Sequence, residues 1–396
     1  MQLSTRLLRF NEPETLKMAR LGRELRARGI DVVDLSLGEP DFDTPQYIKD
    51  AAKKAIDDNW SHYTPVAGFL DLREVICQKF KRDNQLTYTP ENIIVSTGAK
   101  QSLANAVLSI VDADDVVIIP TPFWVTYAAL AQMARAEVRL LKTTQKTGYK
   151  ITPEQLEAAI TPKTKLFIFS SPCNPSGAVY KQHELKSLAE VFKRHPQVFI
   201  ISDEIYEYIN YSGSHQSIAQ FEELKERTIV INGLSKGFAM TGWRLGYLAA
   251  PMEIAKACEK LQGQFTSGTN AITQRAAITA LTSPLDDTNE MVKEFNRRKT
   301  KVIELMKQIE GFEFVEPDGA FYAFPSVDFY FGKNNGSETI ANADDLAMFL
   351  LNKAHVSTVT GSAFGDDDCL RLSFANSMEK IEEGFKRITS ALKQLT

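Results

Sequence analysis

Residues 228–250 read TIVINGLSKGFAMTGWRLGYLAA, and this stretch indicates the architecture of the chain. Its two apolar runs are typical of strands buried on both faces of a sheet, and they flank a glycine-rich loop. Similar runs recur from about residue 90 to 250, separated by stretches with apolar residues three and four apart. The complete set of runs is NIIVSTG, DVVIIP, EVRLL, KLFIFSSP, VFIISDE, TIVINGLSK and LGYLAA. The alternation predicts an α/β fold with a mostly parallel central sheet flanked by helices.

A second domain is expected because 396 residues exceed what one hydrophobic core usually organises. The polar segment LSLGEPDFDTP and the region after residue 300 do not continue the strand and helix rhythm. We therefore expect a smaller α/β domain built from both chain ends. The predicted limits are 1–48 for an N-terminal arm and part of the small domain, 49–295 for the large domain, and 296–396 for the small C-terminal domain.

Composition excludes several classes of protein. A net charge of −4 with evenly spread lysines and arginines argues against a nucleic-acid partner. The first 25 residues mix charged and apolar side chains, which predicts neither a signal peptide nor a membrane span and indicates a cytoplasmic protein. The four cysteines are far apart and the five histidines form no close pair, so we expect no disulfide and no metal site.

Chemically useful side chains follow four of the predicted strands. Gly98 to Lys100 follow NIIVST, Asn174 follows KLFIFSSPC, Asp203 to Tyr206 follow VFIIS, and Ser235 with Lys236 follow TIVINGL. Ligands of parallel sheets bind beyond the carboxyl ends of the strands, where loops and helix N-termini converge. These residues are therefore expected to share one site.

The surroundings of Lys236 suggest a chemistry. A single lysine in a loop is ordinarily a surface residue. Here Ser235 adjoins it and Arg244 follows eight residues later, among glycines that would let the backbone approach a ligand. An amine in such a cleft could hold an aldehyde covalently while its neighbours hold a phosphate.

Five ordered segments carry a resemblance to a known family. SLGEPDFDTP, STGAKQ, SSPCNPSGAVY, SDEIYE and SKGFAMTGWRLGY resemble the signatures of class I aminotransferases, which have pyridoxal-phosphate fold type I. The resemblance extends from about residue 36 to Arg371. Within the family, the chain is most similar to bacterial aspartate aminotransferases that carry a GGK or GAK loop. It implies pyridoxal 5′-phosphate as the cofactor.

The resemblance implies roles around the cofactor ring. Lys236 would form the Schiff base and then move a proton as general base. Asp203 would pair with the pyridine nitrogen, Tyr206 and Asn174 would bind the ring oxygen, and Trp124 would stack on the ring. Each residue alone has an ordinary alternative, such as Asp203 capping a helix or Trp124 filling the core.

The phosphate would lie at a helix N-terminus. Gly98 and Ala99 would open this helix, whose free N–H groups favour an anion, with Lys100 next along the same cofactor-binding loop. Ser235 and Arg244 would complete the phosphate site. The resemblance adds Tyr63 from a neighbouring subunit, which implies a homodimer.

Two positions depart from the family pattern. Gly233 stands where several relatives carry a phosphate-binding serine, so the phosphate site is expected to depend more on its other residues. Cys173 stands where relatives often carry asparagine, and we assign it no catalytic role. The motifs also predict cis peptide bonds at Thr121–Pro122 and Asn174–Pro175, where proline lowers the cost of the cis form.

The resemblance also implies substrate contacts. Arg371 would grip the α-carboxylate in a two-pronged pair, and Lys100 would meet the distal carboxylate of a dicarboxylic substrate. The set of residues placed around the substrate is Gly38, Lys100, Trp124, Asn174, Arg371 and Thr15.

The expected activity is transfer of an amino group from an L-amino acid to a 2-oxo acid in a ping-pong reaction through pyridoxamine phosphate. Aspartate and 2-oxoglutarate are the favoured pair. Prephenate or an aromatic oxo acid is an alternative acceptor, because Thr15 and the GAK loop occur together in relatives that use prephenate. A cofactor-binding regulator is not expected, because such relatives carry an added DNA-binding region and the signatures here begin within the first forty residues.

Overall fold

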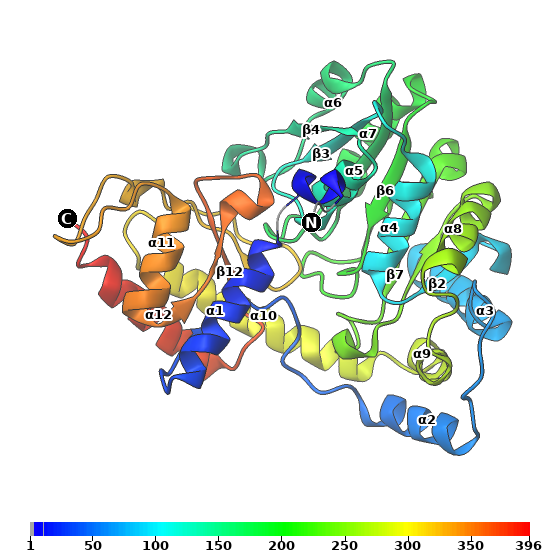
Figure 1. Cartoon of the computed structure of the whole chain (residues 1–396), viewed down its shortest axis with the longest axis horizontal. Coiled ribbons are helices and arrows are strands. Elements are labelled where there is room, and N and C mark those ends of the chain that lie inside the picture. The colour runs from blue at the N-terminus through cyan, green and yellow to red at the C-terminus, as the bar shows by residue number, and fades with distance from the viewer. Residues whose placement is uncertain (1–3, 11) are drawn as a thin grey trace.

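The computed structural model describes residues 4–10 and 12–396, and a seven-stranded sheet forms its centre (Figure 1). The sheet order is β2-β8-β7-β6-β5-β3-β4. Strand β8 runs antiparallel to β2 and β7, and the other neighbours are parallel. The strands are β2 (Ile93–Ser96), β3 (Val116–Pro120), β4 (Glu137–Leu141), β5 (Thr164–Ser170), β6 (Phe199–Asp203), β7 (Thr228–Gly233) and β8 (Gly246–Ala249). The predicted mostly parallel α/β sheet is confirmed.

Six of the seven strands are buried along their length or nearly so, as predicted. Side chains alternate between the two faces, so that Ile229 and Ile231 pack on one side and Val230 on the other. The prediction is wrong for β4, where Glu137 and Leu140 are exposed. This strand lies at the edge of the sheet, beside β3 alone, so less of it is covered.

Helices cover both faces of this sheet (Figure 1). One face packs against α4, α5 and α8, and the other packs against α6 and α7 at one end and α2, α3 and α9 at the other. Capping side chains help to begin some of these helices; the Thr152 hydroxyl accepts from Gln155 N at the start of α6. The helices are α2 (Gln46–Asp57), α3 (Leu70–Lys79), α4 (Ala99–Ile110), α5 (Thr126–Met133), α6 (Pro153–Ala159), α7 (Gln182–Arg194), α8 (Met252–Phe265) and α9 (Ala271–Thr282).

The remaining elements form a smaller unit beside the sheet, where α1, α11 and α12 gather and α10 runs toward the large sheet (Figure 1). Strand β1 pairs with β10, and β12 lies between β11 and β9. The helices are α1 (Glu14–Ala27), α10 (Asp286–Met306), α11 (Ala343–Phe349) and α12 (Met378–Leu392). The strands are β1 (Val33–Asp34), β9 (Tyr322–Ala323), β10 (Val356–Ser357), β11 (Val359–Thr360) and β12 (Leu370–Ser373).

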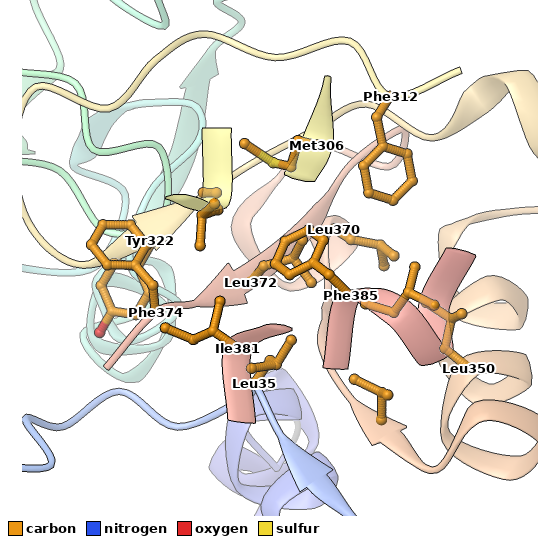
Figure 2. Packing of buried hydrophobic residues seen from close by; sticks show 14 of the residues in the cluster. Leu35, Met306, Phe312, Tyr322, Leu350, Leu370, Leu372, Phe374, Ile381 and Phe385 are labelled. Carbon is orange, nitrogen blue, oxygen red and sulfur yellow. The ribbon is translucent and has the colours of Figure 1, made fainter. Parts of the chain in front are cut away.

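Both chain ends contribute to the core of this smaller unit, as predicted. Leu35 packs in one cluster with Leu370, Leu372 and Ile381 (Figure 2). The limits at residues 48 and 295 stay a prediction, and α10 runs through the second of them. No helix within the described ranges is long and apolar enough to span a membrane.

Candidate functional site

A cavity of about 390 Å³ lies where the strand ends of the large sheet face the smaller unit. This volume is in the usual range for a small-molecule site. Lys236 reaches it from the loop after β7, Thr15 from α1 and Arg371 from β12. Arg244 reaches the same edge because β8 runs antiparallel, so that the loop before this strand meets the loops after its neighbours. The site therefore depends on both units.

Twelve of the residues singled out from the sequence line this cavity together. They are Thr15, Gly38, Ala99, Lys100, Trp124, Asn174, Asp203, Tyr206, Ser235, Lys236, Arg244 and Arg371. Gly98 does not line it but directly precedes the helix that does. Tyr63 is not brought to the cavity within this chain, because it lies by a separate hollow with its side chain almost fully exposed.

The amine of Lys236 lies between the two units. Its Nζ donates to the carbonyl oxygen of Gly38 and sits 5.9 Å from the ring centroid of Tyr206. Burial lowers the pKa of Lys236 to about 8. The positive charges of Arg371 and Arg244 also lower this pKa, whereas the carboxylates of Glu39 and Asp203 raise it. A lysine with a lowered pKa is a better nucleophile near neutral pH, which suits attack on an aldehyde.

Asp203 lies at the end of β6 and is only 4% exposed. Its Oδ2 accepts from the hydroxyl of Tyr127 at 2.7 Å. Burial raises the pKa of Asp203 to about 6, although the hydrogen bonds from Tyr127 and from the N–H of Ile205 oppose this rise. Sequence reasoning missed Tyr127, yet a signal existed, because it follows Trp124 by three residues in TPFWVTY.

A chain of contacts joins Tyr206 to the arginine of β12. The hydroxyl of Tyr206 lies 2.8 Å from that of Tyr322, and the guanidinium of Arg371 lies 4.5 Å from the centroid of the Tyr322 ring. Burial and the neighbouring Tyr322 hold the pKa of Tyr206 well above its ordinary value. Tyr322 was not found from the sequence, because nothing in DGAFYAF distinguishes it from a core tyrosine.

Arg371 is poised to bind an anion. Its Nη1 donates to Asn174 Oδ1 at 3.0 Å and its Nη2 donates to Ser36 O at 2.6 Å. Its Nε is buried and has no hydrogen-bond partner among the described residues. A buried donor left unpaired is costly, so a carboxylate that accepts from it would be favoured.

The start of α4 fits a phosphate. Gly98 precedes the helix with φ +86°, and a Cβ there would lie 2.5 Å from Nη2 of Arg244. The glycine therefore lets the guanidinium approach the free N–H groups of the first helical turn. Gly233 leaves no room for a serine, because a Cβ would lie 2.9 Å from the Cα of Gly246 on the neighbouring strand. Close strand packing thus accounts for this departure from the family pattern.

Lys100 and Trp124 adjoin each other at the cavity. The Nζ of Lys100 lies 4.9 Å from the centroid of the Trp124 ring. Burial, and then the positive charge of Arg244, lower the pKa of Lys100. Within the described ranges no carboxylate pairs with this amine, so an acidic ligand could bind it without displacing a protein group.

The loops that carry Trp124 and Asn174 have the predicted geometry. The peptide bonds Thr121–Pro122 and Asn174–Pro175 are both cis, and Ser171–Pro172 is a further cis bond that the motifs did not predict. Cys173 is buried between them, with its Sγ 3.5 Å from the carbonyl oxygen of Pro122. It lies outside the cavity lining and has a packing role.

These residues fit pyridoxal 5′-phosphate: an amine for its aldehyde, a buried carboxylate for its ring nitrogen, and a helix N-terminus with Arg244 for its phosphate. Residues 30–388 match the family Aminotransferase class I and II. The chain is 43% identical to an aspartate/prephenate aminotransferase from Cereibacter sphaeroides, over 98% of this chain and 97% of that one. It is 42% identical to an aspartate aminotransferase from Geobacillus stearothermophilus, over 98% of both.

Solved structures agree with this assignment. The aspartate aminotransferase from Rhizobium meliloti superposes with a TM-score of 0.96 at 39% identity, and all of both chains is covered. A family match over most of the chain, together with these identities, establishes membership. The chain belongs to the class I and II aminotransferases, and it is an enzyme that depends on pyridoxal 5′-phosphate.

Proposed function

We propose that this aminotransferase takes its amino group from L-aspartate and passes it to 2-oxoglutarate. The observation that carries the proposal is a pair of cations on one cavity, Arg371 with its unpaired Nε and Lys100 with no carboxylate partner among the described residues. Both substrates are dicarboxylates with an amino or oxo group next to one carboxylate. Arg371 would bind the carboxylate next to the reacting carbon, and Lys100 would bind the distal one.

In this proposal each side chain has a task at the reacting atoms. Pyridoxal phosphate supplies the aldehyde that accepts the amino group and an aromatic ring that accepts electrons. Lys236 would hold the cofactor through its aldehyde, and its amine would move the proton at the substrate α-carbon. Asp203 would supply a negative charge for the ring nitrogen, and Tyr206 and Asn174 would donate to the ring oxygen. Trp124 would pack against the ring.

The phosphate group has its own set of residues in the proposal. The N–H groups at the start of α4 and the hydroxyl of Ser235 would donate to it, and Arg244 would supply a positive charge. Among residues 4–10 and 12–396 no acidic side chain pairs with Arg244, and its Nη1 donates to the carbonyl oxygen of Thr241 at 2.8 Å.

We further propose that the enzyme acts as a homodimer in which Tyr63 serves the cofactor of a second copy. Tyr63 is 99% exposed and lines one hollow together with Trp60, another large apolar side chain exposed to solvent. Mixing Tyr63→Phe subunits with Lys236→Ala subunits tests this directly. In a hybrid dimer, one site combines the native Lys236 of one subunit with the native Tyr63 of the other. The mixture is therefore expected to be more active than the two variant preparations added together.

A second candidate acceptor is prephenate. Thr15 lines the cavity together with Lys100, and the similar protein from Cereibacter sphaeroides is an aspartate/prephenate aminotransferase. We also propose a cytoplasmic location, since all four cysteines are free and a reducing compartment preserves thiols. Fractionation of the native source, with detection by antibody, checks the location.

A screen of purified enzyme tests the substrate proposal. Aspartate, asparagine, alanine and phenylalanine are offered as donors, each with 2-oxoglutarate or prephenate as acceptor, and oxaloacetate is offered to every donor except aspartate, which it would only regenerate. The highest kcat/KM is expected for aspartate with 2-oxoglutarate. A higher value for phenylalanine with prephenate would replace the proposal by an aromatic aminotransferase, and equal values for aspartate and asparagine would remove Lys100 from the binding of a distal carboxylate.

A further inference from the structure

A group of buried charged side chains includes the direct sequence neighbours of two residues proposed for the cofactor ring. Asp203 and Tyr206 face the cavity, and the next residue after each is a glutamate with almost no exposed surface. Glu204 is 0% exposed and Glu207 is 5% exposed. Neither glutamate lines the cavity, so the proposed chemistry does not use them. Burial of a carboxylate is costly unless a cation and hydrogen bonds compensate, which raises the question of what holds these two.

Every oxygen of the two carboxylates has a partner. Glu204 Oε1 accepts from Ser202 Oγ at 2.8 Å and from Ser217 Oγ at 2.5 Å, and its Oε2 pairs with His215 Nε2 at 2.9 Å. The His215 side chain is only 6% exposed. On the other carboxylate, Glu207 Oε2 accepts from Asn84 at 2.8 Å and Oε1 pairs with the ammonium of Lys79. We assign no metal here, because these contacts already fill the carboxylate oxygens.

The charges balance only when His215 carries a proton. Glu204 and Glu207 supply two negative charges and Lys79 one positive charge, and a protonated His215 supplies the other. Burial by itself lowers the pKa of His215, but the charge and hydrogen bond of Glu204, with Glu207, outweigh burial and Lys79, so that its pKa lies above the ordinary value. The other groups that sense this cluster are Asp83, Tyr88, Tyr208 and Tyr247.

The cluster and the cavity are coupled through one peptide. Glu204 is bonded to Asp203, and its negative charge adds to burial in raising the pKa of Asp203. The N–H of Glu204 donates to Ile231 O at 2.9 Å, which fixes this peptide to the neighbouring strand β7. A proton on His215 offsets the charge of Glu204 and so reduces its repulsion of the Asp203 carboxylate.

We propose that His215 is a positioning residue that acts through Glu204 to keep Asp203 ionised beside the cofactor ring. The inference rests on the proposed role of Asp203, and it goes beyond the family activity because it assigns a function to a histidine that cannot touch the substrate. The imidazolium pairs with Glu204 Oε2, and neither residue lines the cavity. Loss of this proton leaves an uncompensated negative charge one residue from Asp203.

The test measures the affinity of apoenzyme for pyridoxal phosphate between pH 5 and 8 by fluorescence titration, with no substrate present. In Glu204→Gln the like charge is gone, and the acid limb of the affinity profile should move to lower pH. In His215→Gln the charge of Glu204 is unbalanced, and the limb should move to higher pH. Each displacement is expected to be on the order of one pH unit, as for a charge within several ångströms in a partly polar interior.

The double variant decides whether His215 acts through Glu204. It should match Glu204→Gln alone, because the imidazole has no charge left to neutralise. His195→Gln is the matched control, since His195 Nε2 lies 2.8 Å from Glu157 Oε1 in a similar pair far from the cavity, and its profile should equal that of the parent.

The inference is overturned if the acid limb of the affinity profile moves in the same direction in both single variants. It is also overturned if the acid limb does not move in Glu204→Gln. If His215→Gln fails to fold, the Glu204→Gln profile alone decides, because in that variant the imidazole can lose its proton and leave Glu207 balanced by Lys79. The substrate screen above is independent of this binding measurement. A wrong substrate would therefore leave the pH profiles as expected, whereas a wrong role for His215 would leave the substrate preference unchanged.

Discussion

Replacement of Lys100 by methionine should separate dicarboxylic from neutral donors. The Nζ of Lys100 lies 4.9 Å from the Trp124 ring centroid, so its methylene stem packs near this ring. Alanine would remove this packing as well as the charge, whereas methionine keeps most of the stem. Lys100→Met therefore reports mainly on the charge, and Lys100→Ala reports on both.

The size of the effect follows from the proposed contact. Loss of a hydrogen bond to a charged group costs about 1.5–3 kcal/mol, which is roughly a 10- to 150-fold loss of kcat/KM for aspartate. Asparagine matches aspartate in size and lacks the distal charge, so its kcat/KM should change little. The absence of a carboxylate partner for Lys100 among the described residues means that the substrate does not have to break an existing ion pair.

The assay is the half-reaction with the amino donor alone, followed by the absorbance of the bound cofactor under single-turnover conditions. This design avoids 2-oxoglutarate, which is itself a dicarboxylate. Arg23→Met is the matched control, because Arg23 also lines the cavity as a cation. Equal losses for aspartate and asparagine in Lys100→Met would refute the reasoning, and a selective loss in Arg23→Met would transfer the role to Arg23.

Three further outcomes are expected. Lys236→Ala should bind pyridoxal phosphate without covalent attachment and lose nearly all transamination; borohydride reduction of the parent followed by peptide mapping checks this, and cofactor on another lysine would contradict it. Tyr127→Phe removes a hydrogen bond that lowers the pKa of Asp203, so this pKa should rise above about 6 and the acid limb of kcat/KM should move to higher pH, with greater losses at pH 6 than at pH 8. An unchanged limb would show that Tyr127 does not tune Asp203. Gly98→Ala places a Cβ 2.5 Å from Arg244 Nη2 at a residue with φ +86°. The affinity for pyridoxal phosphate, measured by equilibrium dialysis, is expected to fall about tenfold or more. Near-parental affinity would mean that the close approach of Arg244 to Gly98 is not needed.

Much of the fold could be predicted because its signals are local. The strands of the central sheet were found from apolar runs, and their carboxyl ends then placed Asn174, Asp203 and Lys236 at one edge. The exposure of β4 could not be predicted, since EVRLL resembles the buried runs and only its position in the sheet order leaves it at the edge. Strand order depends on the connections between strands, which a single run of residues does not encode.

Some residues of the proposed site could likewise be found from the sequence, and others only from the tertiary structure. The sequence by itself determined which motifs carry an amine, a carboxylate and a phosphate-binding helix start, because each motif is a few consecutive residues with its own chemistry. Only the tertiary structure decided that Tyr127 donates to Asp203, 76 residues away, and that Tyr322 lies between Tyr206 and Arg371. It also decided that His215 faces Glu204 behind the cavity. Such contacts join side chains from separate elements, and their geometry exists only once the elements have packed.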